Sequence, residues 1–172
     1  KHIVAHDTGV HLLLSNQSPK TAGMIYQAEK IKQIVNNLPY VAKWITIDLG
    51  SNLLPAVQSV TKLCHTLLIV LSPDPLIIKK SKALMSELIS IGIEKPRLVP
   101  VLINRSQSSP PLTLQQIEEQ LEYSITSIFT PASKLAQQAS GSYKAMIFQE
   151  GNEVNAKQFN KLAELIKTTN LY

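Results

Sequence analysis

The sequence has little cysteine and glycine, and it has no long apolar run. Its 172 residues include one Cys and six Gly. A single cysteine excludes a disulfide scaffold and a zinc site built from several thiolates. No apolar run reaches the roughly 18 to 20 residues of a membrane span, and the opening Lys1-His2-Ile3-Val4 is not a signal peptide. We therefore expect a cytoplasmic protein without a transmembrane segment, and we expect Lys1 to be a boundary within a longer protein.

Length and composition indicate one domain. With 44% apolar residues, a chain of this size can build one hydrophobic core. We predict a single domain over residues 1–172.

The net charge of +5 comes from the first half of the sequence. Residues 1–86 carry nine lysines and four acids, whereas residues 87–172 carry eight bases and eight acids. Only Lys79, Lys80 and Lys82 form a cluster. Clustered bases can bind nucleic acid by neutralising phosphates, so nonspecific DNA binding stays open beside a simple solvated helix face.

Short apolar runs alternate with longer stretches of helical period. This alternation is typical of βαβ units, and it predicts an α/β three-layer sandwich with a mostly parallel sheet flanked by helices. The predicted strands are Val10–Ser15, Trp44–Asp48, Thr66–Leu71, Leu98–Ile103 and Ile125–Phe129. The predicted core-facing helix stripes are Ile25, Ala28, Ile31, Val35 and Leu38; Ile77, Leu84, Leu88 and Ile91; Leu114, Ile117 and Leu121; and Phe159, Leu162, Ala163 and Ile166.

Two of these strands are apolar enough to be buried on both faces. We expect Trp44–Asp48 and Thr66–Leu71 to be central in the sheet, because parallel strands covered by helices need not alternate apolar with polar residues. Pro100 cannot donate a ladder hydrogen bond. It therefore predicts a sheet edge, a bulge or a position near the start of its strand.

Polar and turn residues follow the predicted strands at their carboxyl ends, where open α/β sheets bind ligands. Asp48 precedes Gly50 and Ser51, and such an acid can hold magnesium beside a phosphate. Asn104, followed by Arg105, can donate to and accept from a purine edge.

Each of these residues also has a purely structural interpretation. Asp48 and Asn104 are common in turns. Pro131, after the last predicted strand, can border a base pocket or begin a helix.

The first residues suggest two further sites. Asp7-Thr8-Gly9 matches the catalytic triplet of aspartic proteases, but the sequence holds one copy, so a tight turn between Ile3–Ala5 and Val10–Ser15 is the alternative. His2, His6 and His11 lie in the same segment without the carboxylates that would complete a metal site.

Three segments, in order, resemble the MinD/ParA family of deviant-Walker P-loop ATPases, and in particular its CpaE-like members. They are Trp44-Ile-Thr-Ile-Asp-Leu-Gly-Ser-Asn-Leu-Leu-Pro-Ala-Val57, Leu67-Leu-Ile-Val-Leu-Ser-Pro-Asp-Pro75 and Val101-Leu-Ile-Asn-Arg105. Thr8–Leu14 is similar to the family strand that precedes the helix before the Walker B strand. The resemblance implies a P-loop NTPase fold.

The resemblance also implies roles for individual residues. Asp48 matches the Walker B aspartate that helps place Mg²⁺, and Gly50 and Ser51 fall in the switch that senses the γ-phosphate. Asn104 matches the adenine-reading asparagine, and Pro131 falls in the loop that borders the base. It implies ATP and Mg²⁺ as cofactors in a complete chain, and a nucleotide-sandwiching homodimer that acts in division, segregation or pilus placement.

The sequence departs from the family at one decisive point. It contains no G-x-x-x-x-G-K-[ST] phosphate loop, whose backbone and lysine supply much of the electrostatic catalysis. The family also places the phosphate-loop strand inside the sheet, between strands that are present here. We therefore expect the C-terminal part of an ATPase that is not catalytic alone. The alternative is a degenerate, non-enzymatic interaction or dimerisation module of the same fold.

Overall fold

The computed structural model describes residues 3–14, 27–104, 111–142 and 144–169. The chain divides into two compact units, Lys1–Val60 and Thr61–Tyr172.

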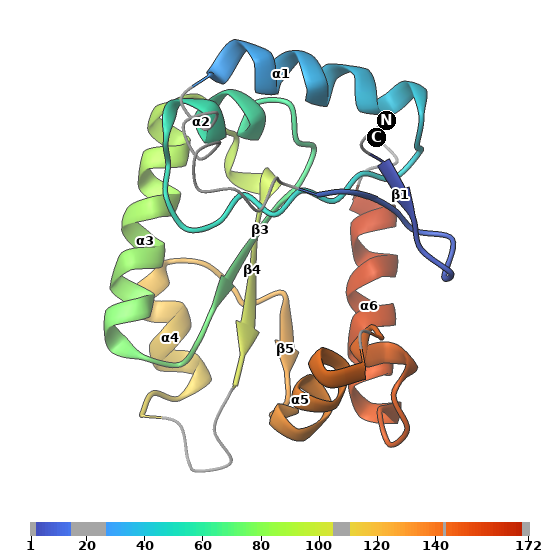
Figure 1. Cartoon of the computed structure of the whole chain (residues 1–172). Coiled ribbons are helices and arrows are strands. Elements are labelled where there is room, and N and C mark those ends of the chain that lie inside the picture. Colours follow the sequence, from blue (N-terminus) through green and yellow to red (C-terminus); the bar gives the residue numbers. More distant parts are fainter. Residues whose placement is uncertain (1–2, 15–26, 105–110, 143, 170–172) are drawn as a thin grey trace. The chain divides into compact units, whose positions relative to one another are not determined.

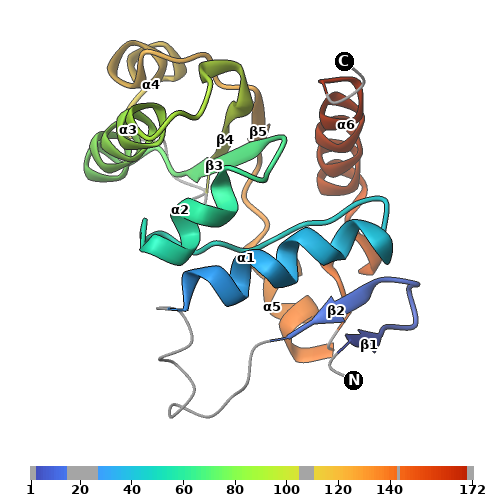
Figure 2. The same cartoon turned by 90° about the horizontal axis from the view of Figure 1, so that it is seen from above.

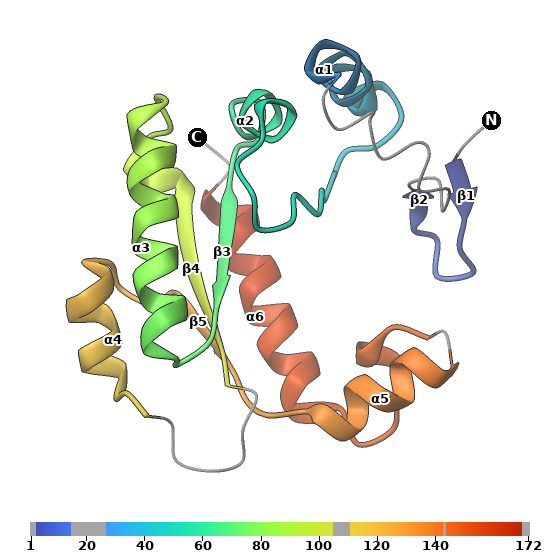
Figure 3. The same cartoon turned by 60° about the vertical axis from the view of Figure 1, so that its left-hand side comes forward.

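The second unit contains a three-stranded parallel sheet in the order β3-β4-β5 (Figure 1). Its strands are β3 (Leu67–Leu71), β4 (Leu98–Ile103) and β5 (Ser127–Phe129). Its helices are α3 (Pro75–Ser90), α4 (Leu114–Leu121), α5 (Ser133–Ser142) and α6 (Glu153–Thr169), with short 3-10 turns η3 (Lys95–Arg97) and η4 (Met146–Phe148). Helices α3 and α4 lie on one face of the sheet and α6 on the other (Figures 2 and 3). This arrangement confirms the predicted three-layer α/β architecture with a parallel sheet.

Helix α3 has a clear start in the sequence. The Asp74 side chain accepts hydrogen bonds from the backbone N–H groups of Leu76 (2.8 Å) and Ile77 (3.1 Å), and Pro75 occupies the first helical position. Both features satisfy or remove donors that a helix leaves unpaired at its N-terminus. Below this cap, Ile78 and Met85 are buried, so α3 is fixed at its end and along its inner face.

Helix α4 begins with a reciprocal cap. Thr113 Oγ1 accepts from the backbone N–H of Gln116, whose side chain accepts from the backbone N–H of Thr113. Ile117 and Leu121 are almost completely buried, and α4 packs against α3. The short helix predicted behind Thr113 is confirmed.

Helix α6 packs against β4 and β5 on the other face of the sheet. Val99 and Val101 of β4, Phe129 of β5 and Leu162 of α6 form a buried cluster, with Ile103 and Ile166 packed against it. The predicted terminal helix that packs on the sheet is therefore confirmed.

Helix α6 does not cover β3. Leu68 and Val70 pair in register with Val99 and Val101, so all four side chains share the face on which α6 lies. Yet Leu68 is 39% and Val70 54% exposed. In the part of the chain that the structure describes, β3 pairs with β4 alone. The predicted central position of Thr66–Leu71 is wrong because β3 is an edge strand of this sheet.

Pro100 is the third residue of β4, which is paired on both sides, so the predicted edge position is wrong and the predicted alternative near the start of the strand is confirmed. The Pro100 carbonyl accepts from the N–H of Thr126 (3.0 Å), so the backbone side of this residue that would bond a neighbouring strand faces β5. Strand pairing with β5 begins only at Val101, opposite Ser127. The proline thus falls where the β4–β5 ladder starts, and no hydrogen bond to β3 is lost.

The first unit opens with an antiparallel hairpin of β1 (Ile3–Ala5) and β2 (His11–Leu13). The N–H of Gly9 donates to the carbonyl of His6 (2.9 Å), and the N–H of His6 donates to the carbonyl of Val10 (2.8 Å). Gly9 has φ +82°, a conformation that favours glycine. The predicted tight turn is confirmed. Of the predicted strand Val10–Ser15, only His11–Leu13 is a strand among the described residues, and it is antiparallel; Ser15 lies outside them.

The rest of the first unit is helical or irregular, and α2 crosses the boundary between the units. Its elements are α1 (Ala28–Asn37), the 3-10 turn η2 (Leu38–Tyr40) and α2 (Pro55–Thr61). Ile31 and Val35 lie on one side of α1 as predicted, and Leu38 follows at its C-cap. All three are half-buried, and no residue of α1 is buried. Ile25 lies outside the described residues.

Residues Trp44–Asp48 do not form the predicted buried strand. The segment has no regular secondary structure, Trp44 is 54% exposed and Ile45 is 38% exposed. An apolar run can form a buried strand only when neighbouring strands pair with its backbone. The segment lacks such pairing in the described residues.

Candidate functional site

The carboxyl ends of β4 and β5 bring two predicted site residues to one edge of the sheet. Asn104 follows β4 directly, and its backbone N–H donates to the carbonyl of Phe129 (3.0 Å), the last residue of β5. Pro131 lies two residues after Phe129, between the end of β5 and the start of α5. Both are half-buried. Asn104 and Pro131 therefore lie at the edge where parallel α/β sheets bind ligands, while Arg105 lies outside the described residues.

Two polar residues of α6 hold the turn after β5. The Oε1 atom of Gln158 accepts from the backbone N–H (3.2 Å) and the hydroxyl (3.4 Å) of Thr130. Asn155 is buried and donates through Nδ2 to the carbonyl of Thr130 (3.4 Å) and to Gln158 Oε1 (3.3 Å). Neither residue was predicted from the sequence. Their signal is that they continue the helical spacing of Phe159, Leu162 and Ile166 toward the start of α6.

The predicted phosphate-side residues lie in the first unit. Asp48 is exposed, and its Oδ1 accepts from the backbone N–H of Gly50 (3.0 Å), which makes an Asx turn. Gly50 has φ +66°, so a glycine suits this turn. Ser51 is also exposed. Since the predicted strand is absent, a turn, and not a strand end, presents these three residues.

Asp48 and Asn104 suit different parts of a bound Mg²⁺-ATP. Mg²⁺ keeps several waters and needs only one or two protein carboxylates beside phosphate oxygens, so the exposed carboxylate of Asp48 is a suitable ligand. The side-chain amide of Asn104 suits the edge of an adenine base. Within the described residues, no three His, Cys, Asp or Glu side chains cluster as a metal site.

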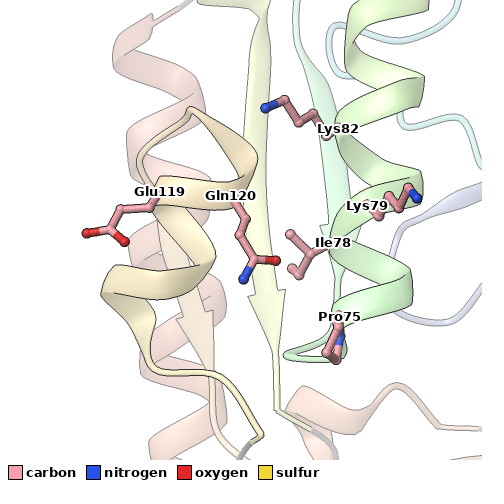
Figure 4. A pocket seen from close by; sticks show the side chains of 6 residues that line it. All are labelled: Pro75, Ile78, Lys79, Lys82, Glu119 and Gln120. Atoms are coloured by element: carbon pink, nitrogen blue, oxygen red, sulfur yellow. The ribbon is translucent and has the colours of Figure 1, made fainter.

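Lys79 and Lys82 of α3 border a groove between α3 and α4. Figure 4 shows this groove, in which Ile78 and Gln120 point toward each other; its lining residues are Pro75, Ile78, Lys79, Lys82, Glu119 and Gln120. Lys82 Nζ donates to Glu122 (2.6 Å). This hydrogen bond, the Lys82 charge and the nearby Lys95 hold the pKa of Glu122 below its usual range.

The lysine cluster is poorly arranged for DNA. Lys79, Lys80 and Lys82 spread over about 160° of the helix circumference, because successive residues are about 100° apart. Lys82 is already paired with Glu122, and the acidic Glu119 shares the groove with Lys79. The cluster therefore presents little concentrated positive charge.

Arg97 binds the end of α2 and the chain that follows it. Its Nη2 donates to the carbonyls of Thr61 (3.1 Å), Lys62 (3.3 Å) and Cys64. Burial raises the pKa of the Cys64 thiol, and the positive charge of Arg97 opposes that rise. A thiol with a raised pKa is a weak nucleophile at neutral pH, so Cys64 is poorly suited to nucleophilic chemistry.

No described helix has both the length and the apolar character that a membrane span requires.

Comparison with known proteins finds similarity in structure alone. No protein-family model matches the sequence, and neither does any curated protein. Among solved structures, a ParA family ATPase from Chlorobium tepidum TLS is similar with a TM-score of 0.77 and 16% sequence identity. The match covers 84% of this chain and 60% of the ATPase chain. The chain therefore has a MinD/ParA-like fold and spans less than two thirds of that solved relative.

Proposed function

We propose that this chain is the C-terminal portion of a MinD/ParA/CpaE-like ATP-binding switch protein that acts in the cytoplasm in spatial positioning or assembly. Asn104, Arg105 and Pro131 would border the adenine base, and Asp48, Gly50 and Ser51 would meet the γ-phosphate and Mg²⁺. The fold similarity over 84% of the chain is the observation that carries the proposal. The arrangement of Asn104 and Pro131 at one sheet edge supports it.

The phosphate loop would come from a segment outside this sequence. No Gly-rich loop with a lysine is present here, and in the described residues the outer edge of β3 has no partner strand. A parallel strand that carries the loop would pair with this edge. We therefore expect this chain alone to recognise the base weakly and not to hydrolyse ATP.

The proposal is tested with the nucleoside alone. Adenosine and guanosine are titrated into the ¹⁵N-labelled chain, and amide shifts near Asn104 and Thr130 report binding. We expect adenosine to bind more tightly than guanosine. Asn104→Ala should weaken adenosine binding about tenfold because it removes a paired base contact, whereas the exposed Asn160→Ala on α6 should not. Equal responses to both nucleosides, or no effect of Asn104→Ala, would contradict the proposal.

Asp48 requires a separate test in a chain that includes the phosphate loop. There, Asp48→Ala should reduce Mg²⁺-dependent ATP turnover at least 100-fold, which is about 2.7 kcal/mol of transition-state stabilisation. Asp7→Ala, which changes an exposed aspartate of the hairpin turn, is the matched control. Unchanged turnover in the Asp48 variant would remove this residue from the site.

A non-enzymatic dimerisation module is the second candidate function. The exposed face of β3 with Leu68 and Val70 favours it, because an uncovered apolar strand at a sheet edge is suited to a protein partner. Sedimentation velocity over a concentration series distinguishes the two functions. A dimer that forms without nucleotide and is lost in Val70→Lys supports the module, and a dimer that forms only with ATP in the complete chain supports the switch.

A further inference from the structure

The first residue of the turn after β5, Thr130, has both its backbone polar groups bound by α6. The N–H of Thr130 donates to Gln158, and the carbonyl of Thr130 accepts from Asn155. Residues at the end of a strand lose their ladder partners, and water usually replaces them. Here α6 supplies both partners, so the turn is attached to the body of the unit.

The two amides can be oriented without ambiguity. A backbone N–H only donates, so the Gln158 atom that faces Thr130 must be the carbonyl oxygen. The Asn155 nitrogen then donates to that oxygen and to the Thr130 carbonyl. Asn155 is only 5% exposed, so its amide cannot exchange these partners for water without cost.

The same helix is fixed against the strands that present the predicted base contacts. The rings of Phe129 and Phe159 pack with centroids 4.7 Å apart. Phe129 also accepts from the N–H of Asn104 (3.0 Å). A continuous series of contacts therefore runs from Asn104 through Phe129 and Thr130 to α6, and Pro131 follows directly in the chain.

We infer that Gln158 and Asn155 are positioning residues that hold the Thr130–Pro131 turn at a fixed distance from Asn104 and so preorganise the adenine pocket. This inference rests on the proposed function. Neither residue is placed in contact with the base; both act through the backbone of Thr130. A preordered turn binds more tightly because its ordering is not paid for on binding.

The test compares two substitutions at one position. Gln158→Met keeps the side-chain length but removes the acceptor, whereas Gln158→Glu keeps an oxygen that accepts from Thr130 and Asn155. Adenosine is the probe because it is uncharged and the added carboxylate does not repel it. We expect Gln158→Met to weaken adenosine binding about three- to tenfold and to speed hydrogen exchange at the Thr130 amide. Gln158→Glu should restore both. The control is Gln137→Met on the exposed surface of α5.

Two results would overturn the inference in distinguishable ways. If the wild-type chain does not prefer adenosine, or Asn104→Ala has no effect, the proposed function fails and the inference fails with it. If the wild-type chain does prefer adenosine and Asn104→Ala does weaken its binding, but Gln158→Met binds adenosine like the wild type, only the positioning role is wrong. Should Gln158→Met not fold, Asn155→Leu decides, because it keeps a side chain of similar size but removes the donor to the Thr130 carbonyl. Unchanged adenosine affinity in that variant would again overturn the inference.

Discussion

The two units of this chain use similar apolar sequences with different results. In the second unit, β4 is buried along nearly its whole length, and Ile78, Met85 and Leu121 are at most 1% exposed. In the first unit, α1 has no buried residue and Trp44 is 54% exposed. Local period and composition are enough to form a helix or a turn, but burial requires a second surface that packs against it.

The largest expected difference between the units is in the cost of removing an apolar side chain. Leu121→Ala should lower the free energy of unfolding by about 2 to 5 kcal/mol, because it leaves a cavity between α3 and α4. Ile34→Ala on α1, where Ile34 is 43% exposed, should change it by less than about 1 kcal/mol. Urea unfolding followed by circular dichroism measures both. Equal losses would mean that α1 is as well packed as α4.

A smaller loss should follow from removing the Arg97 guanidinium. Arg97→Met leaves the carbonyls of Thr61, Lys62 and Cys64 without this donor and should cost about 1 to 3 kcal/mol. Lys43→Met, an exposed cation of the first unit, is the control and should be close to neutral. The same unfolding measurement applies, and a neutral Arg97→Met would show that water replaces the guanidinium at these carbonyls.

Helix capping gives a further contrast, because α4 has a capping box and Gln27 before α1 makes no side-chain cap. Thr113→Ala should lower stability by about 1 kcal/mol, since it removes the acceptor for the Gln116 N–H. Thr113→Ser keeps a hydroxyl and should recover most of the loss. Thermal unfolding of the three proteins checks this, and equal melting temperatures for wild type and Thr113→Ala would rule out a stabilising cap.

The smallest effect is the pH dependence of the Lys82–Glu122 pair on the second unit. The pKa of Glu122 is lowered in the folded protein, so its contribution is present above the unfolded pKa of about 4.3 and is lost as pH falls through the lower folded value. Lys82→Met should remove most of that dependence, because Lys82 lowers the pKa of Glu122 more than Lys95 does. Melting temperatures of wild type and Lys82→Met should therefore differ near neutral pH and converge toward about pH 3. A constant difference would mean that the pair does not contribute through charge.

Sequence patterns predicted the second unit well. Strand Leu98–Ile103 has the predicted bounds, and the cap at Thr113 and the stripe of α6 were recognisable because local chemistry determines them. The predictions for Trp44–Asp48 and for a central Thr66–Leu71 failed, since an apolar run indicates a need for burial but does not identify the strand that will pair with it.

The candidate site was predictable only in part. The place of Asn104 and Pro131 at one edge of the sheet was predictable, because both follow parallel strands of the same sheet. Gln158 and Asn155 were missed because polar residues near a helix start usually face water. Only the fold reveals that Thr130 lies opposite them.

The exposed edge of β3 also affects how the chain behaves during expression and storage. Leu67–Leu71 is a five-residue apolar segment without charge, glycine or proline, and in the described structure its outer backbone groups have no strand partner. Such a segment is a template for intermolecular β-pairing, and its tendency to aggregate rises with protein concentration and with slow folding. A charged residue at the exposed position 70 would act as a gatekeeper against aggregation. The feature that leaves room for a further strand is therefore also the feature that would limit the yield of this chain when it is produced alone.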